Sequence, residues 1–79
     1  MKIECRNCRS KNINARIEDK CNMEENGRVN HVFTINGECR ECKNAIYGTA
    51  EYLQNQDGSE VCSSDAALVG GRVVDYGVT

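Results

Sequence analysis

Cys5-Arg6-Asn7-Cys8 and Cys39-Arg40-Glu41-Cys42 are the two stretches that decide the fold of this chain. In each stretch a two-residue gap lets the backbone curl so that both sulfurs face one point, and main-chain N–H groups inside the curl can donate to those sulfurs. Four thiolates at this spacing form the ligand set of a tetrahedral zinc ion. The sequence therefore predicts one metal site with these ligands: Cys5, Cys8, Cys39 and Cys42.

The two stretches also resemble each other beyond their cysteines. Residues 5–10 align with residues 39–44, and a basic residue follows each of the four cysteines. We interpret the match as two short motifs shaped alike by one metal geometry, and not as the sign of a larger repeat.

The size of the chain limits what it can bury. It has 79 residues, one phenylalanine, three tyrosines and no tryptophan, so its core is small and depends on a metal ion or on disulfides. Six cysteines would suit a secreted disulfide scaffold. However, residues 1–7 lack the apolar core of a signal peptide, and no stretch approaches the roughly 20 apolar residues of a membrane span. We therefore expect a cytoplasmic protein with reduced thiols and no membrane contact.

A long hairpin is predicted between the two cysteine stretches. Apolar and polar residues alternate from Ile13 to Ile17, as in a half-buried strand, and we place the first strand at about residues 12–21. Asn26-Gly27 is a strong hairpin-turn signal. Residues 28–36 are rich in Val, Phe, Thr and Ile and predict the returning strand. Two arms of nearly equal length would bring the cysteine stretches together.

A third strand is predicted over residues 44–53, pairing with the second. Gly48 within it indicates a bulge or a close packing contact. Residues 55–59 form a turn signal, and a short run of strand-like residues follows at 60–62.

The last part of the sequence is less regular. Residues 64–71 have the composition of one or two helical turns, whereas residues 73–78 suit a fourth strand or a tail that orders on a partner. The predicted fold class is therefore mostly β. We expect a small antiparallel sheet of three to four strands, with two zinc knuckles and at most a short C-terminal helical turn.

Two knuckles, the hairpin between them and the strand after the second knuckle resemble the zinc ribbon superfamily over residues 1–53. The resemblance implies that the four cysteines hold one structural zinc ion. Arg9 and Lys43 stand where a glycine often follows the second cysteine of such knuckles, and this difference disfavours iron. We divide the single domain into a zinc-ribbon-like core, residues 1–53, and a C-terminal extension, residues 54–79, that packs on the core or docks a partner.

Cys21 and Cys62 lie outside the two stretches. Cys21 is about 40 Å from Cys8 along an extended strand at about 3.3 Å per residue, so it cannot join the same ion. The third strand returns toward the hairpin tip, and Cys62 follows the next turn. We therefore predict that Cys21 and Cys62 are neighbours, as buried thiols or as a disulfide. His31 is assigned no role, because a lone histidine within a strand is usually an ordinary packed or surface residue.

Basic residues around the cysteine stretches have two interpretations. They could contact the phosphates of a nucleic acid, or they could offset the negative charge of a zinc tetrathiolate. A formal net charge of −2 and few aromatic residues favour the second interpretation. The set comprises Lys2, Arg6, Arg9, Lys11, Arg40 and Lys43.

A closed four-cysteine site leaves no position for substrate, so we expect no catalysis at the metal. The leading hypothesis is a non-catalytic, zinc-stabilised binding protein: a small adaptor, regulator or inhibitor of a larger protein complex. The alternative is a nucleic-acid-binding regulator that uses the basic residues. A thiol redox protein is a minor alternative, because Cys-x-x-Cys redox motifs belong to a βαβ context that this sequence lacks.

Overall fold

The computed structural model describes residues 1–78, and in this part the chain forms strands, turns and bends but no helix. The prediction of a mostly β, antiparallel fold is confirmed. No helix long and apolar enough to cross a membrane occurs among these residues. The strands are β1 (Lys2–Cys5), β2 (Ile13–Met23), β3 (Val29–Cys39), β4 (Ala45–Gln54), β5 (Glu60–Ser64), β6 (Leu68–Val69) and β7 (Gly71–Asp75).

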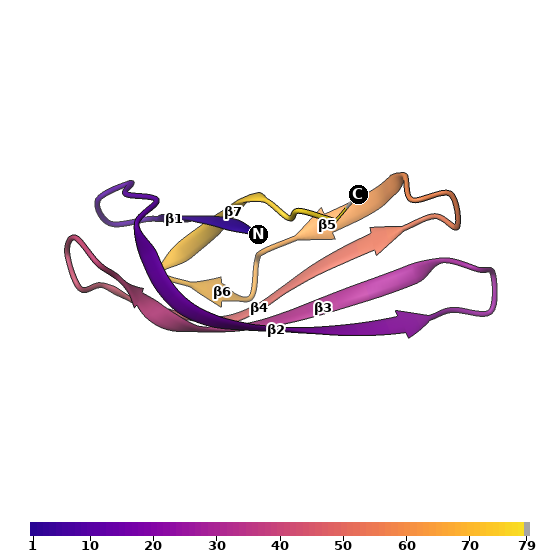
Figure 1. The fold of residues 1–79 in the computed structure, drawn as a ribbon, viewed down its shortest axis with the longest axis horizontal. Helices are drawn as coiled ribbons and strands as arrows, with labels where there is room; N and C mark the ends of the chain where they lie inside the picture. Colours follow the sequence, from indigo (N-terminus) through magenta and orange to yellow (C-terminus); the bar gives the residue numbers. More distant parts are fainter. Residues whose placement is uncertain (79) are drawn as a thin grey trace.

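Two antiparallel sheets make up the fold (Figure 1). The larger sheet has the order β2-β3-β4-β5, and β6 also pairs with β4. The smaller sheet pairs β1 with β7 and lies over one face of the larger sheet. The long strands β2, β3 and β4 are the three that the sequence predicts, with ends that differ by a few residues. The total exceeds three to four because β1 and β6 were not expected.

The β2–β3 hairpin pairs without a break over the whole length of both strands, beginning with Ile13 opposite Cys39. At the turn the N–H of Glu24 donates to the carbonyl of Arg28 at 2.8 Å, so three residues form the loop. Gly27 is the last of them and has a φ of 84°, the left-handed conformation that a three-residue hairpin loop needs. This turn fixes the register, and therefore which side chains of β2 and β3 share a face.

One face of the larger sheet, the inner face, carries the core. Odd-numbered residues of β2 and β3 and even-numbered residues of β4 share it, because the register pairs them with one another. Burial of one aliphatic side chain, such as Ile35, contributes about 1.5–3 kcal/mol. The buried core residues are Ile3, Cys5, Phe33, Ile35, Cys39, Ile46, Ala50, Tyr52 and Leu68.

Gly48 lies in β4 where the chain before β6 approaches most closely, which confirms the predicted close packing. Its φ is 128°, and a Cβ atom at this position would collide with the carbonyl oxygen of Ala67. The N–H of Thr49 donates to the same carbonyl at 3.4 Å. The missing side chain thus lets residues 67–68 pack directly against β4.

The C-terminal part differs most from the sequence-based expectation. Residues 64–71 were predicted as one or two helical turns, but they contain the end of β5, a turn at residues 66–67, β6 and a bend at Gly70. The reason is that Leu68 buries its side chain in the core while its strand pairs with β4, and this packing outweighs a weak local preference for helix. The fourth predicted strand, residues 73–78, begins earlier, at Gly71, and pairs with β1.

Candidate metal centre and apolar groove

The sulfurs of the four predicted ligands meet at one end of the molecule, where all four lie within 4.8 Å of one another. The sulfur of Cys5 is 3.7 Å from that of Cys42, and the sulfur of Cys8 is 3.5 Å from that of Cys39. A tetrahedral ion with metal–sulfur bonds of about 2.3 Å places its sulfurs about 3.8 Å apart. The cluster therefore fits one tetrahedral metal ion with two ligands from each knuckle.

The two knuckles, Cys5–Ser10 and Cys39–Asn44, have the same backbone hydrogen bonds. In each, the N–H of the first residue donates to the carbonyl of the last, at 2.8 Å in the first knuckle and 2.9 Å in the second. The carbonyl of the first residue accepts from the fifth at 2.9 Å in both. The six-residue sequence match therefore corresponds to one local fold that is built twice.

The residue after the second cysteine of each knuckle is left-handed, with a φ of 62° at Arg9 and 63° at Lys43. Glycine adopts this conformation without a steric penalty, whereas other L-residues lose about 1–2 kcal/mol. The frequent glycine of such knuckles thus has a conformational reason. In this chain Arg9 and Lys43 adopt the same conformation despite that penalty.

The strands hold the first cysteine of each knuckle, and the turns hold the second. Cys5 ends β1 and Cys39 ends β3, and both are fully buried at the end of the core. Cys8 and Cys42 are carried by the turns that follow and are exposed. Two rigid strands therefore position half of the ligand set, and the shared turn geometry brings the other half toward it.

Two asparagine amides join the knuckles across the sulfur cluster. The Nδ2 of Asn7, in the first knuckle, donates to the sulfur of Cys42 at 3.4 Å. The Nδ2 of Asn44, in the second knuckle, lies 3.7 Å from the sulfur of Cys5 and donates to the carbonyl of Gly70 at 3.1 Å. Such donors orient and stabilise thiolate ligands. Neither asparagine was predicted as part of the site, although their places inside and just after the cysteine pairs were a usable signal in the sequence.

The surroundings of the sulfurs shift their pKa values in opposite directions. The side-chain amide of Asn7 and the N–H of Asn44 lower the pKa of Cys42 to about 6. The N–H of Ser10 favours the Cys8 thiolate, but loss of hydration and the neighbouring sulfurs raise the pKa of Cys8 to about 12. Hydrogen-bond donors therefore favour the thiolate of Cys42, whereas the neighbouring sulfurs disfavour that of Cys8. A divalent cation at their centre would favour all four thiolates.

Arg6 is fixed to the segment between β6 and β7. Its Nε donates to the carbonyl of Gly71 at 2.9 Å, and its backbone N–H donates to the carbonyl of Gly70 at 3.0 Å. Its Nη2 also lies 3.9 Å from a carboxylate oxygen of Asp65. Arg6 therefore ties the first knuckle to the C-terminal strands.

The other predicted basic residues separate into two groups. Arg9, Arg40 and Lys43 are exposed on the knuckles, and none of them forms an ion pair within residues 1–78. Lys2 and Lys11 lie instead beside an open groove. The six basic residues thus have three different surroundings.

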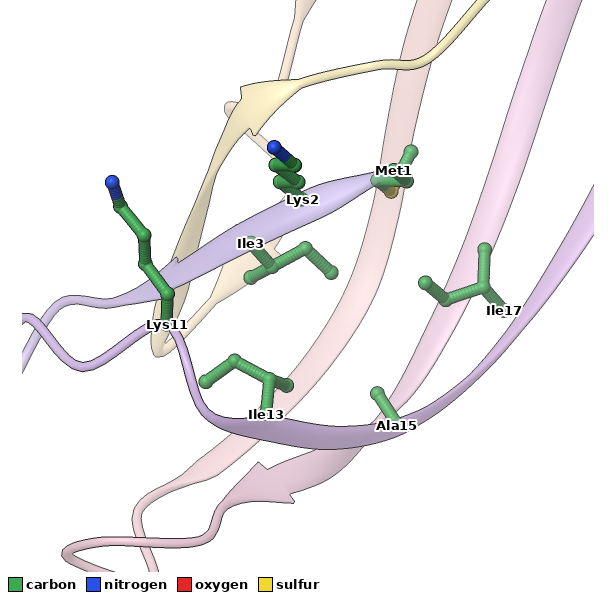
Figure 2. Close-up of a pocket in the computed structure, with 7 residues that line it drawn as sticks. All are labelled: Met1, Lys2, Ile3, Lys11, Ile13, Ala15 and Ile17. Carbon is green, nitrogen blue, oxygen red and sulfur yellow. The ribbon is translucent and has the colours of Figure 1, made fainter.

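The groove lies on the inner face between β1 and β2, with a volume of about 350 Å³. Figure 2 shows Ile3 and Ile13 facing each other across it, whereas the amino groups of Lys2 and Lys11 extend away from the apolar side chains. Within the described chain, β2 is the last strand of its sheet and has one edge without a strand partner. The lining residues are Met1, Lys2, Ile3, Lys11, Ile13, Ala15 and Ile17.

The prediction that Cys21 and Cys62 are neighbours is wrong. Cys21 lies on β2 opposite His31, and Cys62 lies on β5 opposite Leu53, so β3 and β4 separate them. Three strand spacings of about 4.8 Å put them about 14 Å apart, well beyond the reach of a disulfide. Cys21 belongs to the inner face and Cys62 to the opposite face, and both are free and exposed. The two cysteines do lie at nearly the same height along the strands, as predicted, but the prediction did not take β3 and β4 between them into account.

Comparison with protein-family models, curated proteins and solved structures finds no match for this chain. The geometry of the molecule therefore carries the interpretation. Four cysteines lie within metal-binding distance of one another on a small β fold, an arrangement compatible with a zinc ribbon.

Proposed function

We propose that the chain is a non-catalytic, zinc-stabilised binding protein that acts as a small adaptor, regulator or inhibitor of a larger protein complex. The observation that carries this proposal is the apolar groove between β1 and β2, with its basic rim and the unpaired edge of β2. The four-cysteine cluster supports the structural role of the metal, because four protein ligands leave no position for a substrate.

Zinc is the proposed ion, and the zinc ribbon is the proposed fold family. Zinc takes four thiolates in closed tetrahedral sites, and iron is the alternative for the same ligand set. Two knuckles of equal conformation, joined by the β2–β3 hairpin, support the family assignment. Elemental analysis of the purified chain tests the ion: one zinc per chain is expected, and iron in its place would contradict the proposal.

The chemistry of the groove favours an extended segment of another protein as the ligand. Residues 13, 15 and 17 present apolar side chains at every second position, which matches the alternating side chains of an added strand. The free edge of β2 offers backbone donors and acceptors to such a strand. Lys2 and Lys11 at the rim favour a partner with carboxylates. The proposed ligand is therefore an apolar, extended segment flanked by acidic residues.

Replacement of Ile17 by glutamate tests the groove. Ile17 is 39% exposed, and Val61 on β5, outside the groove, is 37% exposed, so Val61→Glu is a matched control. Affinity capture with the tagged full chain and nuclease treatment is expected to recover the same protein partner with wild type and Val61→Glu. Ile17→Glu should weaken that complex at least about tenfold, which corresponds to about 1.4 kcal/mol, because it buries an unpaired carboxylate. Equal binding by both variants would contradict the groove assignment.

Nucleic-acid binding is a second candidate because Arg9, Arg40 and Lys43 are exposed without ion-pair partners in the described chain. It predicts affinity for DNA or RNA that falls steeply with salt and disappears when all three residues are changed to glutamine. Binding that survives nuclease treatment and depends on Ile17 would favour the protein-binding function instead. Deletion of residues after Ser63 is unsuitable for either test, because β6 and β7 pair with β4 and β1.

A further inference from the structure

Three side chains of different chemistry meet on the inner face toward the hairpin turn, far from the knuckles. Asp19 and Cys21 share a face of β2 because they are two residues apart, and His31 on β3 lies directly opposite Cys21. Their ligand atoms all lie within 4.8 Å of one another. Eight residues of strand separate this level from Ile13 and Cys39, which is about 26 Å at about 3.3 Å per residue. The cluster is therefore independent of the four-cysteine site.

The distances within the cluster are close to those around a tetrahedral metal ion, and the distance from Nδ1 to the sulfur is the one that would have to lengthen. Nδ1 of His31 is 3.0 Å from the sulfur of Cys21 and 3.2 Å from each carboxylate oxygen of Asp19. The sulfur lies 3.7 and 3.8 Å from the two oxygens. A zinc ion with bonds of about 2.3 Å to sulfur and about 2.0–2.1 Å to nitrogen and oxygen needs about 3.3–3.6 Å between these atoms. The observed distances bracket these values.

Hydrogen bonds within the cluster leave one buried nitrogen without a partner. Nδ1–H of His31 can donate to one carboxylate oxygen of Asp19, and the thiol of Cys21 can donate to the other. Nε2 of His31 is buried and has no hydrogen-bond partner within residues 1–78. Three ligand atoms of the kinds that zinc prefers thus lie together at one place, and the histidine that supplies one of them is buried.

A nucleophilic cysteine explains the arrangement less well. When a histidine activates a catalytic cysteine, its two ring nitrogens contact different groups: one faces the thiol and the other faces a carboxylate. Here both groups share Nδ1. A divalent cation can bind all three groups at once, because it compensates the negative charges of Asp19 and of a Cys21 thiolate.

We propose that Asp19, Cys21 and His31 form a second metal site, which binds Zn²⁺ through a carboxylate oxygen, a thiolate sulfur and Nδ1. Asp19 and Cys21 are exposed, so the fourth position faces solvent and is filled by water or by an atom of a bound partner. Nε2 has no partner to support the ring from behind, so this site binds zinc more weakly than the four-cysteine site.

The test uses the full chain with one equivalent of zinc already bound by the four-cysteine site. Cys21 and Cys62 are then the thiols open to an alkylating reagent, and Cys62 serves as an internal control. Addition of further Zn²⁺ is expected to slow alkylation of Cys21 at least about tenfold and to leave Cys62 unchanged. Native mass spectrometry should show a second ion on the wild-type chain. Failure of Zn²⁺ to protect Cys21, with the first ion retained, would overturn the proposal.

Matched variants assign the second ion to these residues. Asp19→Asn and Cys21→Ser keep the side-chain size and should each weaken binding of the second ion at least about tenfold. Glu18→Gln removes the same charge from the opposite face of β2, and Cys62→Ser removes a thiol outside the cluster; both should leave binding unchanged. Retention of the first ion in every variant shows that the fold is intact. A second ion that is insensitive to Asp19→Asn and Cys21→Ser would also overturn the proposal.

Discussion

The two ends of the molecule are held together by different means. The principal axes measure 42 × 17 × 16 Å, so the ends have little core in common. At the knuckle end, which consists of Cys5–Ser10 and Cys39–Asn44, sulfur ligands occupy the place of large apolar side chains. At the hairpin end, four rings are grouped with centroids 5.3–6.3 Å apart: His31, Phe33, Tyr52 and Tyr76. A narrow chain with few aromatic residues thus concentrates its rings at one end and needs another source of stability at the other.

Loss of the metal should lower the stability of the chain more than any other change, and it acts at the knuckle end. Structural zinc binding supplies about 10–16 kcal/mol, more than the net stability of about 5–15 kcal/mol that a domain retains. Cys39→Ser, or chelation of the wild-type chain, is therefore expected to abolish cooperative unfolding, measured by circular dichroism during denaturation. Cys62→Ser is the control. Cooperative unfolding of the metal-free chain would show that the rings alone sustain the fold.

Phe33→Ala should cause the next largest loss of stability, and it acts at the hairpin end. Phe33 is 5% exposed and contacts the rings of His31 and Tyr76, so its truncation is expected to cost about 3–5 kcal/mol. Tyr47→Ala, which removes a ring that is 50% exposed, should cost about 1 kcal/mol or less. Denaturant titration gives both values. We expect Phe33→Ala to keep its first zinc ion, whereas loss of that ion would mean that the two ends are strongly coupled.

The smallest effect is expected at the left-handed residue of the second knuckle. Lys43→Gly removes a backbone penalty of about 1–2 kcal/mol but adds about 0.5–1 kcal/mol of chain entropy, so stability should stay equal or rise slightly. Arg40→Gly removes the same charge where the conformation needs no glycine and should lower stability by about 0.5–1 kcal/mol. Thermal unfolding of the zinc-loaded chains compares them. A larger loss in Lys43→Gly than in Arg40→Gly would show that the Lys43 side chain, and not its backbone, matters.

The sequence carried enough information for the knuckles and the three long strands, because cysteine spacing and alternating polarity are local signals. The pairing of β1 with β7 could not be predicted in this way, because alternation over only four residues is too short to be distinctive and the partner strand lies far along the chain. Residues 64–71 misled for a related reason: Leu68 is placed by its tertiary contacts, and local composition alone suggests a helix.

The two candidate metal sites differ in the same way, since one follows from local sequence signals and the other depends on how distant strands pair. The four ligands followed from spacing alone, whereas the neighbours of Cys21 depended on strand order and on the length of one turn. The three-residue loop that ends with Gly27 sets Cys21 opposite His31, and with that register known the cluster with Asp19 can be read from the sequence. Strand order places Cys62 beyond two further strands, and no local pattern reports strand order.

The pairing of β1 with β7 has a consequence for biosynthesis. Ile3 pairs with Val73, so β1 finds its strand partner only after all the strands between β1 and β7 have been synthesised. Contacts between such distant parts of a sequence raise the contact order and slow folding. The nascent chain therefore carries Cys5 on an unpaired segment until β7 has emerged, whereas the knuckle that contains Cys39 and Cys42 has its own hairpin beside it much earlier.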